Sequence, residues 1–276
     1  MKLDILISTI DEGITNVENV ILPKRKGVTY IVSHQYRDAK YKNIPKALTR
    51  DDVIVSHIPG QGVTKSRNHA IQLASGDIAL FSDDDVTYTP EYFDTVIKTF
   101  QSNKDLDVAL FKIKTPAGFP EYKKYPTEIE KLNKLPFSVG TIEIAIKINS
   151  IKDKYILFDE RFGAGQPLLI GSDESIFVLD CLRKNLNVWF FPEYVVEHPY
   201  ESSVKKYKKY DKRIVSVTGA YDARINGIKA IPKAIGGTLK ILPDLIKNKK
   251  SPVSYLRERL SATLYILRTN KNNLKF

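Results

Sequence analysis

Short apolar runs and helical patterns alternate along the first two hundred residues of the chain. The apolar runs are rich in β-branched and aromatic side chains, which favour strands, and they lie at residues 3–8, 28–33, 53–57, 78–81, 108–114, 138–148 and 188–191. Helical patterns lie at residues 64–74, 90–100 and 173–185. Alternation of strands with helices predicts an α/β fold with a mainly parallel central sheet flanked by helices. We expect this domain to cover residues 1–202.

The pattern changes after residue 202, where lysines are mixed with aliphatic residues. Residues 203–276 therefore predict a basic helical extension, which opens with the lysine-rich stretch at 205–210. Helix-breaking residues are expected to divide its middle into short pieces, namely Pro232, Gly236, Gly237 and Pro243. A helical stripe closes it, formed by Leu256, Leu260, Leu264 and Leu267.

Composition places the chain among ordinary globular proteins, with 276 residues, 42% hydrophobic and 27% charged. Its single cysteine excludes an intrachain disulfide and a thiolate metal cluster, and favours a reducing, cytosolic compartment. The first residues, Met1 to Ile7, carry an acid within an apolar run and make a poor signal peptide. No apolar run approaches the ~18 residues that span a bilayer.

The net charge of +11 is unevenly distributed. Residues 1–202 carry 25 Lys and Arg against 28 Asp and Glu, whereas residues 203–276 carry 18 against 4. The basic excess thus belongs to the extension alone. A segment of this kind is expected to meet an anionic surface, most often a membrane or a nucleic acid.

Three consecutive carboxylates, Asp83, Asp84 and Asp85, follow the apolar run at 78–81. We call these residues the acidic triplet. The carboxyl ends of strands in an open α/β sheet are where such folds bind ligands. Adjacent carboxylates repel one another unless a cation or water stabilises them, and their oxygens suit Mg²⁺ or Mn²⁺. The triplet predicts a divalent metal that binds a phosphorylated substrate.

The order of the motifs narrows this prediction. Ile7-Ser8-Thr9-Ile10-Asp11-Glu12 ends the first strand, Lys65-Ser66-Arg67-Asn68-His69-Ala70 lies on a helix, and Ser75-Gly76-Asp77 precedes the triplet. Gly171-Ser172-Asp173-Glu174 and Glu197-His198-Pro199 come later. Each motif alone is weak, but their order over roughly residues 1–200 resembles the inverting family 2 glycosyltransferases of the GT-A fold. The resemblance implies a donor-binding half at about 1–115 and an acceptor half at about 116–202.

The same resemblance implies a nucleoside-diphosphate sugar as donor, with UDP as the expected nucleotide, and Mn²⁺ or Mg²⁺ as cofactor. Asp83 and Asp85 correspond to the family's Asp-x-Asp pair, which would hold the metal against the diphosphate. Asp84 would face the sugar or the ribose. His198 matches a late histidine that ligates the metal in some members.

Asp173 matches the general base of the family, which takes the proton of the acceptor hydroxyl as that oxygen attacks the anomeric carbon. Its position at a helix start favours the ionised carboxylate. The family often has Glu before the Asp, and here Ser172-Asp173-Glu174 departs from that pattern. Glu174 therefore remains an alternative base.

Other residues would bind the nucleotide. The loop after the first strand would contact the nucleobase and ribose through Ser8, Thr9, Asp11 and Glu12. Two cations on a later helix, Lys65 and Arg67, would contact the diphosphate. Gln35 is the candidate at the end of the second strand, where the family often has an acid that reads uracil. The identity of the base therefore stays open.

Three functions remain to be compared. The first is a glycosyltransferase of polysaccharide or glycolipid synthesis, with a saccharide or lipid-linked acceptor. Its extension would hold it at the inner face of an anionic membrane, or would instead pack as an ordinary helical subdomain. The second is a sugar nucleotidyltransferase, although Ser8 to Gly13 is no Gly-rich, Arg-containing phosphate loop. The third is a non-catalytic membrane or nucleic-acid binder; nucleic acid is not expected, because the extension carries no recognised nucleic-acid motif.

Overall fold

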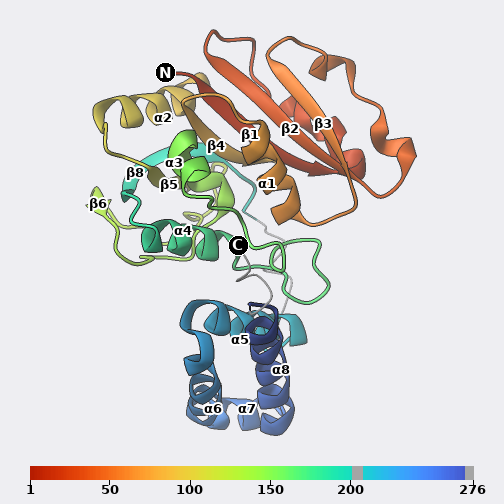
Figure 1. Ribbon diagram of the computed structural model, residues 1–276, viewed down its shortest axis with the longest axis vertical. Helices are drawn as coiled ribbons and strands as arrows, with labels where there is room; N and C mark the ends of the chain where they lie inside the picture. The colour runs from red at the N-terminus through yellow and green to blue at the C-terminus, as the bar shows by residue number, and fades with distance from the viewer. Residues whose placement is uncertain (201–207, 271–276) are drawn as a thin grey trace. The chain divides into compact units, whose positions relative to one another are not determined.

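The computed structural model describes residues 1–200 and 208–270 (Figure 1). The chain divides into two compact units, one made of residues 1–160 and 177–201, the other of 161–176 and 202–276. The parts of the predicted extension at 203–207 and 271–276, including half of the lysine-rich stretch at 205–210, lie outside the described residues. We call the two parts the sheet unit and the helical unit.

The sheet unit is built on one eight-stranded mixed sheet with the order β3-β2-β1-β4-β7-β5-β8-β6. Its strands are β1 (Leu3–Ile10), β2 (Val28–Tyr36), β3 (Val53–Pro59), β4 (Ile78–Asp83), β5 (Val108–Lys114), β6 (Glu130–Lys131), β7 (Ile144–Lys147) and β8 (Val188–Glu197). The first four strands are parallel neighbours, and β7 is antiparallel between β4 and β5. This architecture confirms the predicted α/β fold.

Alternate side chains of the strands enter two hydrophobic cores, one on each face of the sheet. Ile5 and Ile7 of β1 join the core that includes α2 (Pro90–Ser102) and the 3-10 helix η1 (Asp11–Asn19). Leu6 joins the core that includes α1 (Val63–Leu73), α3 (Ile148–Asp153) and α4 (Asp173–Arg183). Strands buried on both faces read as continuous apolar runs, which is why the sequence reveals them.

One predicted strand is wrong in its extent. Residues 138–148 form a loop, the 3-10 helix η4 (Thr141–Glu143) and only then the short strand β7. The fully buried Glu143 carboxylate causes the turn, because it accepts hydrogen bonds from the Gly140 N–H at 2.6 Å and the Tyr125 hydroxyl at 2.8 Å. A local bond of this type competes with the strand ladder.

β8 is longer than the predicted run at 188–191 and continues through Pro192. Proline lacks the N–H that a regular ladder needs, and the pairing of β8 with β5 shifts register between Leu110 and Lys112. This irregularity accommodates Pro192 and carries the strand on to Glu197, next to the acidic triplet.

The helical unit contains α5 (Lys212–Asn226), η6 (Gly227–Lys229), α6 (Ala230–Lys240), α7 (Leu242–Lys247) and α8 (Pro252–Asn270). Helices α5 and α8 approach closely, since a Cβ on Gly219 would lie 2.2 Å from the Arg259 carbonyl oxygen. The predicted breaks at Pro232 and Gly236-Gly237 are wrong. Pro232 lies in the first turn, where no N–H is needed, and Gly237 makes room for the Arg259 side chain.

The predicted leucine stripe of α8 does not match its buried face. The residues of α8 that are buried are Arg259, Ala262, Thr263 and Ile266, whereas Leu264 is 39% exposed. Polar residues occupy this face because Arg259 pairs with the buried Asp222 of α5 at 2.6 Å. A buried ion pair interrupts the apolar periodicity from which the stripe was inferred.

Candidate active site

The carboxyl ends of β1 and β4 bring the first candidate residues together. Ser8 lies opposite Asp83 in the parallel pairing of the two strands, and both Ser8 and Thr9 are buried. The Thr9 hydroxyl donates a hydrogen bond to the Asp84 carboxylate. A Cβ on Gly13 would lie 2.3 Å from the same carboxylate, so η1 needs a glycine there. Ser8 and Thr9 lie in β1 rather than in a loop, and they form one edge with the acidic triplet.

Asp83 and Asp84 are partly buried, whereas Asp85 is exposed. Asp84 is the member whose pKa is raised. Burial raises its pKa to about 6, and the negative charges of Asp83 and Asp85 act in the same direction, while the Thr9 hydrogen bond opposes them. Three adjacent carboxylates repel one another when ionised, so the edge attracts cations.

Arg67 of α1 provides one such cation. Its guanidinium lies 3.3 Å from the Asp83 carboxylate, and its side chain is only 5% exposed. The Phe158 ring lies beneath it, with 5.6 Å between the guanidinium carbon and the ring centroid. A buried, aromatic-supported guanidinium is held in a fixed orientation, which suits recognition of phosphate oxygens.

His198 reaches the triplet from the end of β8. Thr87, just after the triplet, and Glu197 exchange two main-chain hydrogen bonds of 2.9 and 3.0 Å, which bring the strand end alongside. His198 Nε2 then lies 3.5 Å from the Asp85 carboxylate, and its Nδ1 lies 2.5 Å from the Pro199 carbonyl oxygen. Burial lowers the pKa of His198, but Asp85 outweighs it and the net pKa is raised.

Asp11 begins the 3-10 helix η1, which follows β1 directly. It has a φ of 50° and is 1% exposed, and its carboxylate accepts the Arg37 N–H at 2.8 Å and binds the Arg37 guanidinium at 2.5 Å. Burial raises the pKa of Asp11, but the hydrogen bonds and charge of Arg37 outweigh it, so the net pKa is lowered. Asp11 therefore holds the start of η1 in place. The neighbouring Glu12 is exposed.

The other two donor candidates lie on β2 and α1. Gln35 is 2% exposed at the end of β2, opposite Ile10, and its side-chain nitrogen has no protein partner within the described part of the chain. Lys65 is exposed, and its ammonium lies 3.2 Å from the Pro59 carbonyl oxygen at the end of β3.

Both candidate bases begin α4, in the part of that helix that belongs to the helical unit. Asp173 is 2% exposed and Glu174 is half-buried. Ser172, with a φ of 69°, precedes them, and its carbonyl accepts the Ile176 N–H at 3.0 Å. The carboxylates thus occupy the first turn, where the helix dipole favours negative charge.

Two polar groups near the candidate edge were not predicted. His34 is fully buried; its Nε2 lies 2.9 Å from the Asp11 carbonyl oxygen, and its Nδ1 lies 2.9 Å from Nδ1 of His57. Asn68 of the helix motif donates to the Phe158 carbonyl at 3.0 Å and accepts the Phe158 N–H at 2.8 Å. Asn68 thereby fixes the segment that supports Arg67. One indication of this role was present in the sequence, because Asn68 stands next to Arg67 in the helix motif.

The acidic triplet does not by itself form a metal site. Among residues 1–200 and 208–270, no group of three or more His, Cys, Asp or Glu side chains is arranged to hold a metal ion. Asp85 and His198 nevertheless provide an oxygen and a nitrogen donor 3.5 Å apart. The Asp85 carboxylate fits Mg²⁺ or Mn²⁺ as proteins usually bind it, through one or two carboxylates together with substrate phosphates and water. The His198 imidazole adds a softer nitrogen donor.

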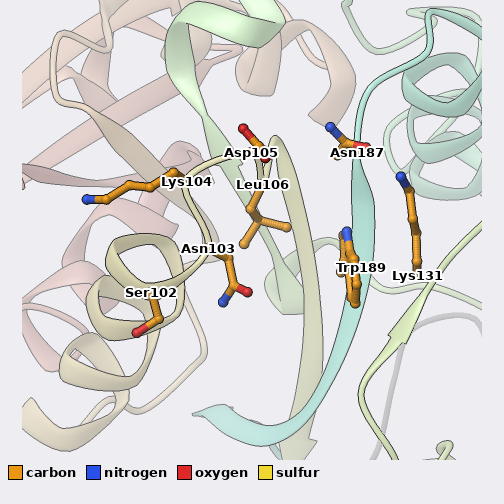
Figure 2. A pocket seen from close by; sticks show the side chains of 8 residues that line it. All are labelled: Ser102, Asn103, Lys104, Asp105, Leu106, Lys131, Asn187 and Trp189. Carbon is orange, nitrogen blue, oxygen red and sulfur yellow. The ribbon is translucent and has the colours of Figure 1, made fainter.

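A hollow of about 560 Å³ lies at the other end of the strands (Figure 2). Its lining comes from the residues before β5 and at the start of β8, with Lys131 of β6: Ser102, Asn103, Lys104, Asp105, Leu106, Lys131, Asn187 and Trp189. None of the candidate donor-binding residues lies in it.

Part of the chain matches a known protein family. Residues 29–161 match the model "Glycosyl transferase family 2", a range that contains Arg67 and the whole acidic triplet. Over this part of its length, the chain is similar to glycosyltransferase family 2. The match confirms the resemblance inferred from motif order and supports a glycosyltransferase over a nucleotidyltransferase.

Solved structures share the fold of this chain. A crystal structure of S. aureus TarS, residues 1–349, in complex with UDP-GlcNAc is 16% identical, with a TM-score of 0.55; the match covers 100% of this chain and 76% of that one. S. aureus TarS 1–349 without ligand is 16% identical, with 100% and 75% covered and a TM-score of 0.51. No curated protein matches the sequence. Within residues 1–200 and 208–270, every helix is too short or too polar to cross a membrane.

Proposed function

We propose that this family 2 glycosyltransferase transfers a sugar, with inversion, from a UDP-sugar to a hydroxyl acceptor of a polysaccharide or glycolipid. The observation that carries the proposal is the convergence of the acidic triplet, Arg67 and His198 at one sheet edge. Two crystal structures of the similar TarS hold UDP-GlcNAc and UDP, which supports a uridine nucleotide.

Different residues of the edge bind different parts of the donor. Ser8 and Thr9 provide the floor for the nucleoside, and the buried side-chain nitrogen of Gln35 provides a donor for a base carbonyl. Arg67 offsets diphosphate charge from its fixed position above Phe158. Asp83 orients Arg67, and Asp84 faces the ribose or the sugar.

Asp85 and His198 are the proposed metal ligands, with Asp83 as the third candidate. When bound, Mn²⁺ or Mg²⁺ would stabilise the negative charge that develops on the departing nucleoside diphosphate. The pairing of His198 Nδ1 with the Pro199 carbonyl leaves Nε2 directed at Asp85. A second shell of this kind fixes the orientation of a ligating imidazole.

Asp173 is the proposed base, and Glu174 is the alternative. As the acceptor oxygen attacks the anomeric carbon, its proton passes to the carboxylate while the bond to the diphosphate breaks. The first turn of α4 stabilises the carboxylate by about 0.3–1 kcal/mol, which keeps it ready to accept a proton.

Incubation with a panel of UDP- and GDP-sugars, Mn²⁺ and hydroxyl acceptors tests the proposal. We expect nucleoside diphosphate release with a UDP-sugar, and a product of inverted anomeric configuration by NMR. Asp173→Asn and Glu174→Gln, measured separately, identify the base as the residue whose loss abolishes transfer. Retained configuration, or full activity of both variants, would contradict the mechanism.

We also propose that residues 203–276 place the enzyme on an anionic membrane surface, where lipid-linked acceptors lie. The concentration of positive charge in this segment supports the proposal, because each lysine or arginine near such a surface contributes about 1 kcal/mol.

A further inference from the structure

Helix α6 of the helical unit buries small side chains and exposes large aliphatic ones, which is the opposite of the usual pattern for a helix that faces water. Its buried positions are small residues, with Ala230 and Ala234 at 0% exposure and Thr238 at 5%. Its exposed positions include large aliphatic residues, with Ile235 at 43% and Leu239 at 64%. A surface helix normally buries its large aliphatic side chains and exposes its polar ones.

The exposed aliphatic residues form one line. Ile228 is 68% exposed just before α6, Pro232 is exposed one turn later, and Ile235 and Leu239 follow. Pro232, Ile235 and Leu239, spaced three and four positions apart, lie on one side of α6, and Ile228 lies four positions earlier in η6. We call these four residues the outer face of α6. A contiguous exposed apolar surface of this kind marks an interaction site.

The charge around the outer face is positive throughout. Residues 223–243 contain four basic residues and no acidic one. Lys229 and Lys240 are exposed, whereas Lys233 is committed to the buried Asp222 at 2.5 Å. An apolar line beside lysines is the pattern of a helix that lies in the interface of a membrane.

Charge also selects among possible occupants. A second copy of the chain would bring another segment of the same strong positive charge, and like charges oppose association. Nucleic acid would satisfy the lysines, but phosphates leave the isoleucines and leucine without an apolar partner. Only a surface of anionic headgroups above acyl chains fits both properties.

We propose that the outer face of α6 inserts into the interface of a bilayer that contains anionic lipids. The insertion deepens the membrane contact proposed above and rests on it. Ile228, Ile235 and Leu239 enter the boundary between headgroups and acyl chains, and Lys229 and Lys240 contact the headgroups. The contact holds the glycosyltransferase on the membrane without a spanning helix.

Vesicle co-sedimentation without donor or metal tests the insertion. We compare vesicles of phosphatidylcholine mixed with phosphatidylglycerol against vesicles of phosphatidylcholine alone. Substitution of Leu239→Gln or Ile235→Gln should lower the partition coefficient about tenfold each, because one aliphatic side chain no longer leaves water. The combined variant with Ile228→Gln should lose about a hundredfold or more. Val253→Gln on α8 is the matched control, since Val253 is 69% exposed and outside the outer face.

A second measurement reports insertion directly. The chain has one cysteine, Cys181, and it is fully buried. A fluorophore sensitive to polarity therefore labels Leu239→Cys selectively. Its emission should rise on addition of the anionic vesicles, whereas the same label on Val253→Cys should not respond.

The outcomes separate the two proposals. If the wild-type chain does not bind anionic vesicles, the membrane contact itself is wrong. If it binds but the combined variant remains within about twofold of it, charge alone explains the contact and the insertion is wrong. A lowered melting temperature of the combined variant would show that the outer face packs within the chain, which also overturns the proposal. Asp85→Ala should bind vesicles like the wild type, because the donor edge takes no part.

Discussion

The buried Glu143 carboxylate provides the sharpest test of how the sheet unit is held together. It is fully buried, and Lys123, whose side chain is 19% exposed, is the cation 2.9 Å away. Lys123→Met keeps the aliphatic stem but leaves the carboxylate without its cation. Removal of one partner of a buried pair costs about 3–5 kcal/mol, since an uncompensated charge remains. Glu143→Gln removes the charge itself and should cost only about 1 kcal/mol.

Dependence on pH follows from the same carboxylate. Burial raises the pKa of Glu143, and Lys123 and the hydrogen bonds oppose that rise. A group whose pKa is raised in the folded state stabilises the fold at low pH, and its contribution is lost as the pH rises through the folded-state pKa. The deficit of Lys123→Met should therefore be largest at neutral pH and should shrink as the pH falls toward about 4, the usual pKa of glutamate.

Urea unfolding monitored by circular dichroism measures these differences in the free energy of unfolding. The matched control is Lys124→Met, because Lys124 is the exposed neighbour. In the Glu143→Gln background, Lys123→Met should become nearly neutral. The reasoning is refuted if Lys123→Met and Lys124→Met unfold at the same urea concentration, or if the deficit of Lys123→Met grows on acidification.

Three further predictions concern buried polar groups and helix packing. Asn68→Ala removes both hydrogen bonds to Phe158 and should cost about 2–3 kcal/mol in urea unfolding, whereas Gln72→Ala, exposed on the same helix, should be near neutral. Burial, together with the neighbouring imidazole, lowers the pKa of His34, so its contribution to the stability of the fold is complete above about pH 6.5 and is lost as the pH falls. The melting temperature should therefore drop less between pH 7 and pH 5 in His34→Gln than in the wild type. An equal drop in the two proteins would contradict this. Gly219→Ala should destabilise by about 1–3 kcal/mol because its Cβ meets the backbone of the facing helix, whereas Gly236→Ala has open space and should stabilise by about 0.5–1 kcal/mol; equal effects would argue against the helix packing.

Most strands of the sheet unit were predictable because they are buried on both faces and read as plain apolar runs. The same logic failed at residues 138–148, where a buried Glu143 turns the chain through contacts with Tyr125 and Lys123. It failed again in α8, whose buried face carries Arg259 paired with Asp222. In both places a polar group satisfied by residues far away in the sequence replaced the apolar side chain that periodicity requires.

Motif order predicted the resemblance to the family, and it predicted that the ends of β1 and β4 meet at one edge of the sheet. The role of this edge in donor binding stays a prediction. Motif order did not reveal what each residue contacts. Asp11 was expected to bind the nucleoside, yet it is committed to Arg37, an arginine in no motif. The supporting roles of His34 and Asn68 were equally hidden, because they depend on main-chain groups that a sequence does not place.

Titration calorimetry of UDP binding tests the central claim most directly. The wild-type chain is expected to bind UDP in Mn²⁺ and to lose most of its affinity in EDTA, because Asp85 and His198 would hold the metal near the diphosphate. Asp85→Asn should bind UDP weakly and equally in Mn²⁺ and EDTA, while the matched surface variant Asp94→Asn retains the metal dependence. Undiminished, Mn²⁺-dependent binding by Asp85→Asn would contradict the assignment of the acidic triplet as the donor site.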